Sequence, residues 1–135
     1  MTPYHHAVSS AKKFGGRWQD YIEIHSWFDA SKEYMADFRH RALRHHAQGI
    51  FECERVVGKV IYNSEGKPVP VRLIGEQHCI EDLGRVPSIQ DWFLCIQPAD
   101  WMKKAGTTKE FRDSLDGIGG NLDTKAPEAL ACPQV

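Results

Sequence analysis

The chain has 135 residues, of which 41% are hydrophobic and 26% are charged, and its net charge is -1. This length supports one modest hydrophobic core, and the balanced charge excludes a chain-wide attraction to nucleic acid. The apolar runs are far shorter than the roughly 20 residues needed to cross a bilayer, and the N-terminal MTPYHH is unlike a signal peptide. We therefore predict one cytoplasmic domain without a membrane span.

The first half of the chain is predicted to be helical. A short helix covers residues 4–14, a stronger one covers residues 18–30, and a third covers residues 32–57 with an interruption near Gly49. Because residues 31–33 leave room for only a short connection, the second and third helices should pack as antiparallel or sharply angled neighbours. Their apolar faces are then expected to meet.

Strand-forming runs follow these helices. VGKVIYN and KPVPVRLIG flank the turn sequence NSEGK, which predicts a β-hairpin whose proline-containing strand lies at an edge. EQHCIEDLG is typical of one or two helical turns, and Ser88 is a suitable N-cap for a helix that runs to Ile96. The sequence thus predicts an α+β fold, with N-terminal helices, a hairpin and a C-terminal helix in a single domain over residues 1–102. Residues 103–135 are predicted to be a flexible tail.

Titratable side chains fall on the apolar faces of the two longer helices. At about 100° per residue, His25 and Asp29 lie on the inward stripe of their helix, one turn apart. In the following helix His46 falls near the middle of the apolar arc, whereas His45 lies at its border. A buried, unpaired carboxylate costs several kcal/mol, so Asp29 needs a partner. We expect His25, Asp29 and His46 to meet where the helices pack.

Zinc is the metal ion that such a group of side chains favours. It takes four protein ligands in a tetrahedron, mostly histidine or cysteine with occasional carboxylates. Other segments supply further imidazoles that can complete the shell. The predicted metal ligands are these: His25, Asp29, His46, His5, His6 and His78. His78 also forms a second His-x-x-x-Asp pair with Asp82, which the helical projection directs toward solvent or a cleft.

A metal-free interpretation explains the same residues. In it Asp29 accepts a hydrogen bond from His25, and His46 bonds a backbone carbonyl or a tyrosine, as buried polar groups do. A solvated helical turn with a local hydrogen bond then accounts for His78 and Asp82. Both interpretations remain open at this point.

A metal-dependent hydrolase is the alternative function. In such an enzyme three protein ligands leave one coordination position for water, and a nearby carboxylate acts as general base. The candidate bases are Glu52, Glu81 and Asp82. A closed shell of four ligands favours a structural role, whereas an open position beside a pocket favours hydrolysis.

The stretch RHRALRHH supplies a local basic patch. Arg39, Arg41 and Arg44 suit a phosphate or an acidic protein surface. Because acidic residues share the same helix, the mixed charge is more typical of a solvated face or a protein contact than of a nucleic-acid site. Nucleic acid is therefore not the favoured partner.

Five motifs together carry a resemblance: HHAVSSAKKFGG, IHSWFDASK, DFRHRALRHHAQGIF, IGEQHCIEDLG and DWF. They resemble a family of small uncharacterised proteins from bacteria, phages and mobile elements, over residues 4–102. The resemblance implies no activity and no site residue, but its mobile-element setting implies that a small inhibitor or accessory protein is a serious option. Small phage proteins that block host defence nucleases, such as CRISPR effectors, are similar in size. We therefore expect a structural zinc ion and a function through protein–protein interaction, with the protein partner unidentified.

Overall fold

The computed structural model describes residues 1–104. Its α-helices are α1 (Pro3–Phe14), α2 (Ile22–Asp29), α3 (Ala47–Val57), α4 (Val71–Leu83) and α5 (Ile89–Phe93). Its strands are β1 (Val60–Tyr62) and β2 (Pro68–Pro70), and its 3₁₀ helices are η1 (Trp18–Asp20), η2 (Ala30–Glu33), η3 (Phe38–Leu43) and η4 (Asp100–Lys103). Helices with one antiparallel hairpin confirm the predicted α+β class.

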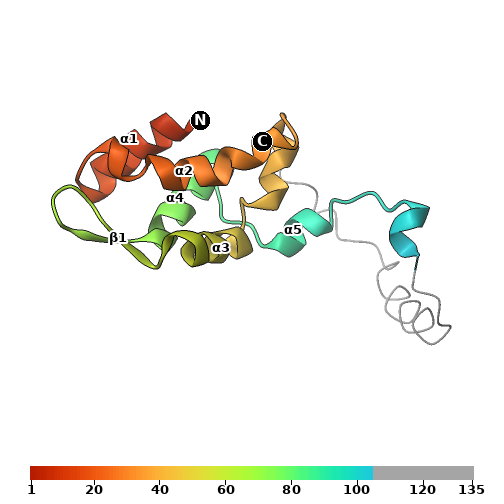
Figure 1. The fold of residues 1–135 in the computed structure, drawn as a ribbon. Coiled ribbons are helices and arrows are strands. Elements are labelled where there is room, and N and C mark those ends of the chain that lie inside the picture. The colour runs from red at the N-terminus through yellow and green to blue at the C-terminus, as the bar shows by residue number, and fades with distance from the viewer. Residues whose placement is uncertain (105–135) are drawn as a thin grey trace. The chain divides into compact units, whose positions relative to one another are not determined.

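The chain divides into two compact units after Ile89. Residues 1–89 form the first unit, in which α4 packs against α1, α2 and α3 (Figure 1). The described residues from Gln90 onward belong to the second unit and include most of α5 and the 3₁₀ helix η4. The predicted domain bounds of 1–102 remain a prediction, and residues 105–135 of the predicted tail lie outside the described residues. No helix among the described residues is long and apolar enough to cross a membrane.

Local signals around α1 produce the predicted first helix. The Thr2 side chain accepts a hydrogen bond from the backbone N–H of His5, and Pro3 occupies the first helical position, where its missing N–H costs nothing. The helix ends at Gly15 as expected. Its buried face carries His6 and Ser10 toward the interior of the first unit.

The predicted helix over residues 32–57 is wrong in its first half. After α2 the chain passes through η2 and η3, and α3 begins only at Ala47. His46 has an extended backbone and caps α3, because its side chain accepts a hydrogen bond from the backbone N–H of Gly49. Asp37 caps η3 by accepting from an N–H two residues later. These side-chain caps stabilise turns in place of a continuous helix.

The loss of that helix changes which apolar side chains are buried. One continuous helix would turn three of them inward, whereas the structure leaves all three exposed: Met35 (40%), Phe38 (52%) and Leu43 (57%). Tyr34 is 75% exposed beside them. The segment between α2 and α3 therefore displays apolar surface instead of burying it.

The hairpin forms where the strand pattern predicts it. β1 pairs with β2 in antiparallel register, with Ile61 opposite Val69, and the side chain of Asn63 accepts hydrogen bonds from the backbone of Glu65 and Lys67 in the turn. α4 begins directly after Pro70, earlier than expected. The hairpin thus leads straight into the helix that carries two of the candidate site residues.

The core of the first unit lies between its helices. Its largest fully buried apolar side chains include Tyr21, Phe28, Ile74 and Val71. Burial of a large apolar side chain contributes about 1.5–3 kcal/mol, so these contacts hold α2 against α4. Several histidines are buried in the same interior, and their polar atoms need partners there.

Candidate metal centre

Two helices of the first unit carry the same short motif. α2 places His25 and Asp29 one turn apart, and α4 places His78 and Asp82 one turn apart. Because α2 and α4 pack against each other, both motifs meet in the interior. A fifth side chain, that of His45, comes from the short link between η3 and α3 and is fully buried.

Four of these side chains form what we call the donor cluster: Asp29, His45, His78 and Asp82. One ligand atom from each lies within 4.8 Å of all the others. Nε2 of His78 lies 3.0 Å from Nε2 of His45, 3.4 Å from Oδ1 of Asp29 and 3.3 Å from Oδ2 of Asp82. Nε2 of His45 lies 3.0 Å from Oδ2 of Asp82 and 3.5 Å from Oδ1 of Asp29. Buried groups of this composition can hold a metal ion.

Both carboxylates of the donor cluster are ionised although they are buried. Burial raises the pKa of Asp82, but hydrogen bonds from the neighbouring histidines outweigh burial and hold the pKa below its ordinary value. The pKa of Asp29 is lowered in the same way, against the effect of burial, by contacts with His45 and His78. Two negative charges in one buried place require compensating positive charge.

Among the described residues, cations lie at the outer oxygens of these carboxylates. The N-terminal ammonium of Met1 lies 3.4 Å from Oδ1 of Asp82. Lys32 Nζ lies 3.8 Å from Oδ2 of Asp29. His6 Nε2 lies 3.1 Å from Oδ1 of Asp82, and Arg41 Nη2 lies 3.8 Å from the same atom. The inner oxygens, Oδ1 of Asp29 and Oδ2 of Asp82, therefore face the two histidines of the cluster.

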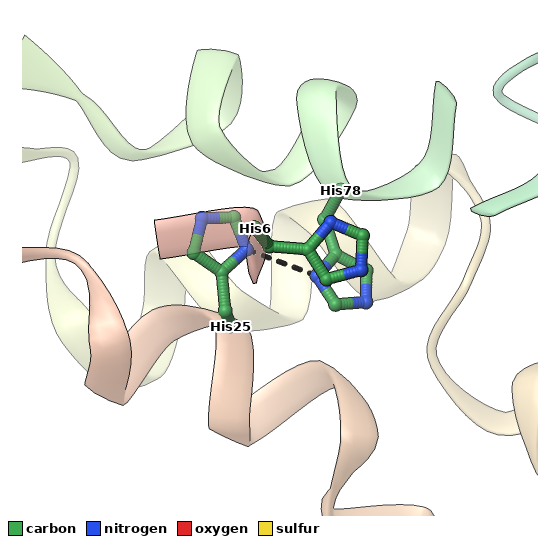
Figure 2. A group of neighbouring side chains, drawn as sticks. All are labelled: His6, His25 and His78. Atoms are coloured by element: carbon green, nitrogen blue, oxygen red, sulfur yellow. Dashed lines mark hydrogen bonds between the residues drawn. The ribbon is translucent and has the colours of Figure 1, made fainter. Parts of the chain in front are cut away.

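A second set of imidazoles lies beside the donor cluster, and we call it the histidine group: His6, His25 and His78. Figure 2 shows the three rings packed together. Nδ1 of His25 lies 2.9 Å from Nδ1 of His78, and Nε2 of His25 lies 2.8 Å from Oγ of Ser10. Burial, together with the neighbouring imidazoles, lowers the pKa of His25 to about 2, so its ring is neutral.

His6 has a different environment from the other two members. Its Nδ1 lies 3.0 Å from Oε1 of Glu81, and its Nε2 contacts Oδ1 of Asp82. Burial lowers the pKa of His6, but hydrogen bonds to Asp82 and Glu81 outweigh burial and raise it above the ordinary value. A ring that donates from both nitrogens has no lone pair for a metal ion. The structure therefore places the predicted ligand His6 as a charged partner of the two carboxylates.

Two other predicted ligands lie outside both sets. His5 is exposed, and its Nδ1 lies 2.7 Å from Oγ1 of Thr2. His46 is buried as predicted, but Nδ1 accepts from the Gly49 N–H and Nε2 lies 3.0 Å from the carbonyl oxygen of Ala42. The metal-free expectation, a bond to a backbone carbonyl, describes His46 correctly.

Both members of the predicted His25–Asp29 pair contact His78, but at different ring nitrogens. His25 is bonded to His78, whereas Asp29 lies beside His45 and His78. The prediction that His78 and Asp82 face solvent or a cleft is wrong, since their side chains are 0% and 1% exposed. α4 is covered by α1, α2 and α3, so both of its faces are inside near these residues.

The predicted ligands omitted His45 and Asp82, for different reasons. The helical projection placed His45 at a border because it assumed a continuous helix, and the extended backbone at His46 turns this part of the chain differently. Asp82 carried a usable signal, because the spacing of His78 and Asp82 repeats that of His25 and Asp29. Equal motifs on two packed helices predict a shared site.

The three arginines of the basic patch have partners within the chain. Arg39 Nη2 lies 2.6 Å from a carboxylate oxygen of Asp37. The guanidinium of Arg44 lies 4.2 Å from the ring centroid of Trp27, a cation–π contact. Arg41 is mostly buried beside the donor cluster. This stretch is therefore engaged in local contacts.

The buried neutral histidines predict acid sensitivity of the metal-free protein. Burial lowers the pKa of His25 to about 2, that of His40 to about 4, and that of His46 below its ordinary value. Below pH 6.5 the unfolded chain therefore binds protons that the folded chain does not, and stability falls as the pH falls. Each such group contributes up to about 1.4 kcal/mol per pH unit. His6 is protonated in both states there, so its raised pKa adds no slope.

We expect the free energy of unfolding, measured by urea titration in chelator, to fall by more than about 1.4 kcal/mol per unit between pH 6 and pH 4.5. His25→Gln should reduce the slope by about one proton, whereas His5→Gln, an exposed control, should leave it unchanged. A slope in His25→Gln equal to that of the wild type would show that His25 is not the buried neutral group described.

Comparisons with known proteins give one match. The family described as a domain of unknown function matches residues 1–102. No curated protein and no solved structure matches the chain. The match confirms the expectation of an uncharacterised family over nearly the residues that carry the resemblance, while an origin in phages or mobile elements stays a prediction.

Proposed function

The chain belongs to that domain of unknown function, DUF6915, and from the geometry of its buried donors we propose that it binds one zinc ion in the donor cluster. The ion would be held by two carboxylate oxygens and two imidazole nitrogens, a donor set of the kind that zinc accepts. In this proposal the metal has a structural role, and the protein acts through contact with another protein.

The distances between the donor atoms carry this proposal. For metal–ligand bonds of about 2.0–2.2 Å, the edge of a regular tetrahedron measures about 3.3–3.6 Å. The donor cluster has separations of 3.0, 3.0, 3.3, 3.4 and 3.5 Å between its ligand atoms. Five of the six edges of such a tetrahedron are therefore close to the length that zinc requires, and the ligand atoms of the two carboxylates lie within 4.8 Å of each other.

The chemistry of the donors supports the same conclusion. The inner oxygens of Asp29 and Asp82 can only accept hydrogen bonds. A neutral imidazole has one nitrogen with a hydrogen and one nitrogen with a lone pair that can bind a metal ion. A cluster of two such oxygens and two imidazole nitrogens therefore has more acceptors than protons when the rings are neutral. A divalent cation would satisfy all four inner atoms at once, on the side of the carboxylates that Lys32, His6 and Arg41 do not contact.

The position of the ligands supports a structural role. Asp29 ends α2, His45 follows η3, and the other two ligands lie on α4, so one ion would connect three parts of the first unit. Four protein ligands close the shell, and none of their side chains is more than 5% exposed. A closed, dry shell is typical of structural zinc.

The ligands Asp29 and His45 also bracket residues 30–44, which carry the exposed apolar surface. Tyr34 is 75% exposed and Phe38 is 52% exposed. Exposed aromatic side chains grouped on one segment are typical of a protein-contact surface. We propose that the metal fixes both ends of this segment and so presents it to a protein partner.

The proposed partner class is a host defence nuclease such as a CRISPR effector, and it rests on the resemblance to mobile-element proteins together with this surface. Expression of the wild type should then protect a targeted plasmid from interference in cells. Replacement of Tyr34 and Phe38 by serine should abolish protection while leaving zinc binding unchanged. Protection by the double variant at the wild-type level would remove this segment from the proposal.

Metal analysis and hydrogen exchange test the metal and the segment separately. Protein purified without a histidine tag should contain about one equivalent of zinc by plasma mass spectrometry. At free zinc about 100 times the dissociation constant, amides of residues 30–44 should exchange up to about 100-fold more slowly than in chelator. Zinc below a tenth of an equivalent would contradict metal binding, whereas equal exchange with zinc bound would contradict only the role of the segment.

A hydrolase is the second candidate, and one observation favours it. Nη2 of Arg41 lies 3.8 Å from Oδ1 of Asp82, and Nε and Nη1 of Arg41 are buried without a hydrogen-bond partner among the described residues. A guanidinium beside a metal ion can hold an anionic group such as a phosphate ester. Metal-dependent hydrolysis of bis(p-nitrophenyl) phosphate that is lost in Arg41→Gln would support this function over the structural one.

A further inference from the structure

We infer that the histidine group is not a second metal site but the outer shell of the first. In this shell His78 donates a hydrogen bond to His25, His25 donates to Ser10 and Ser10 donates to Gln77. These hydrogen bonds fix which nitrogen of His78 binds the metal. This inference rests on the proposed metal site. It assigns Nε2 of His78 as the ligand atom, and it assigns a positioning role to three residues that touch no ligand atom of the donor cluster.

The chain starts at Gln77, whose amide can point in one direction only. Its nitrogen lies 3.3 Å from the carbonyl oxygen of His6 and 2.8 Å from Oε1 of Glu81. The backbone carbonyl oxygen of His6 can only accept, so the group that faces it must be the NH₂ of the amide. This NH₂ group therefore also faces Oε1 of Glu81, and Oε1 of Gln77 must face Ser10.

Ser10 has one hydroxyl hydrogen, and it donates this hydrogen to Gln77. Its Oγ lies 3.0 Å from Oε1 of Gln77, which only accepts, so Ser10 donates to Gln77. Oγ of Ser10 also lies 2.8 Å from Nε2 of His25. Because the hydroxyl has no second proton, it accepts there, and Nε2 of His25 must carry the hydrogen.

The same logic passes through His25 to His78. His25 is fully buried, and its two ring nitrogens contact a serine hydroxyl and a second imidazole, neither of which is a carboxylate that would balance a charge. With the single hydrogen of the neutral ring on Nε2, its Nδ1 holds a lone pair. Nδ1 of His78 lies 2.9 Å from that atom and must donate to it, along the dashed line in Figure 2. Neutral His78 therefore keeps its hydrogen on Nδ1 and its lone pair on Nε2, the nitrogen that belongs to the donor cluster.

His6 is not available as a ligand for a second metal ion. Both of its nitrogens face carboxylate oxygens, at 3.0 Å for Glu81 and 3.1 Å for Asp82, and both donate. In the remaining pair, Nδ1 of His78 donates its hydrogen to Nδ1 of His25, so neither of these two nitrogens offers a free lone pair. His6 also occupies Oδ1 of Asp82, which leaves Oδ2 for the ion.

Such an outer shell has a known physical effect. A ligating histidine whose other N–H is held by a hydrogen-bond partner is fixed in tautomer and orientation, and loss of that partner costs about 10- to 100-fold in metal affinity. Here the partner is a second imidazole, which is itself held by a serine and a glutamine. Neutral imidazole ligands select a transition-metal ion such as zinc over magnesium or calcium.

Nitrogen-15 NMR of histidine-labelled full-length protein, loaded with zinc, tests the assignment. We expect His78 to show a protonated Nδ1 and a metal-bound Nε2, and His25 to show a protonated Nε2. Ser10→Ala should weaken zinc affinity at unchanged stoichiometry, by no more than the roughly 10- to 100-fold expected for loss of His25 itself, and shift His25 toward a mixture of tautomers. Ser9→Ala, the same change one residue away and bonded to Glu81 instead, should leave both affinity and tautomers nearly unchanged.

The outcomes separate the two proposals. Zinc bound through Nδ1 of His78, a hydrogen on Nδ1 of His25, or a second equivalent of zinc that is lost in His6→Gln would overturn the inference while metal binding stands. Failure of the wild type to bind any zinc would overturn the proposed function. In that case the metal-free spectrum still reports whether His25 carries its hydrogen on Nε2, because this step does not depend on the ion.

Discussion

Zinc is expected to raise the free energy of unfolding of the metal-free protein by about 4 kcal/mol when free zinc is about 1,000 times the dissociation constant. In the proposed site the ion would bind only the folded chain, because its four ligands come from distant positions in the sequence. Asp82→Asn should remove this increment, since it deletes one inner carboxylate and leaves the shape of the side chain unchanged. The measurement is urea unfolding of each protein with zinc and with chelator.

Two controls make that result specific to the donor cluster. Asp100→Asn makes the same chemical change at an exposed carboxylate and should keep the full increment. Magnesium at millimolar concentration should give none, because magnesium prefers an octahedral shell of oxygens. If Asp82→Asn fails to fold, Asp29→Asn serves in its place. An equal zinc increment in the wild type and in a folded cluster variant would contradict the site.

Gly49→Ala is expected to destabilise the protein by about 3–5 kcal/mol, the upper range for a single substitution. An added Cβ at this position would lie 1.9 Å from the carbonyl oxygen of Arg44. That oxygen belongs to the backbone, so rotation of a side chain cannot relieve the clash. The turn that carries His45 and His46 would have to move, and zinc affinity should fall with it.

Gly66→Ala is the matched control for that substitution. Gly66 lies in the hairpin turn with a φ of 74°, and an added Cβ meets nothing within 4 Å. Only the strain of an L residue at positive φ remains, which is about 1 kcal/mol. Chemical denaturation of both variants tests the comparison. A smaller loss for Gly49→Ala than for Gly66→Ala would show that the close approach at Arg44 is not a constraint.

Local signals were sufficient for the parts of the fold that depend on neighbours in sequence. The helix after Thr2 and the hairpin between VGKVIYN and KPVPVRLIG follow from a cap, a turn and a strand pattern. The site was predictable only in part, because His25, Asp29 and His78 meet through the packing of α2 on α4. No period in the sequence encodes which ring nitrogen faces which neighbour.

The structure differs most from the prediction over residues 32–57, which form two 3₁₀ helices and α3 instead of one helix. Apolar residues recur there at helical spacing, but the capping side chains of Asp37 and His46 stop helical propagation locally. A histidine at an N-cap is a weak signal, because serine, threonine and aspartate dominate that position. His46, predicted to be a ligand, caps a helix, whereas His45, predicted to lie at the border of the apolar face, belongs to the donor cluster.

The span of the donor cluster, from Asp29 to Asp82, has a kinetic consequence. Because these four side chains converge only where α4 packs on α2, an ion bound there would be expected to enter late in folding. An interaction absent from the transition state slows unfolding and leaves the folding rate nearly unchanged. Bound metal would then slow the unfolding of the folded protein. The metal itself would dissociate no faster than the helices around it open.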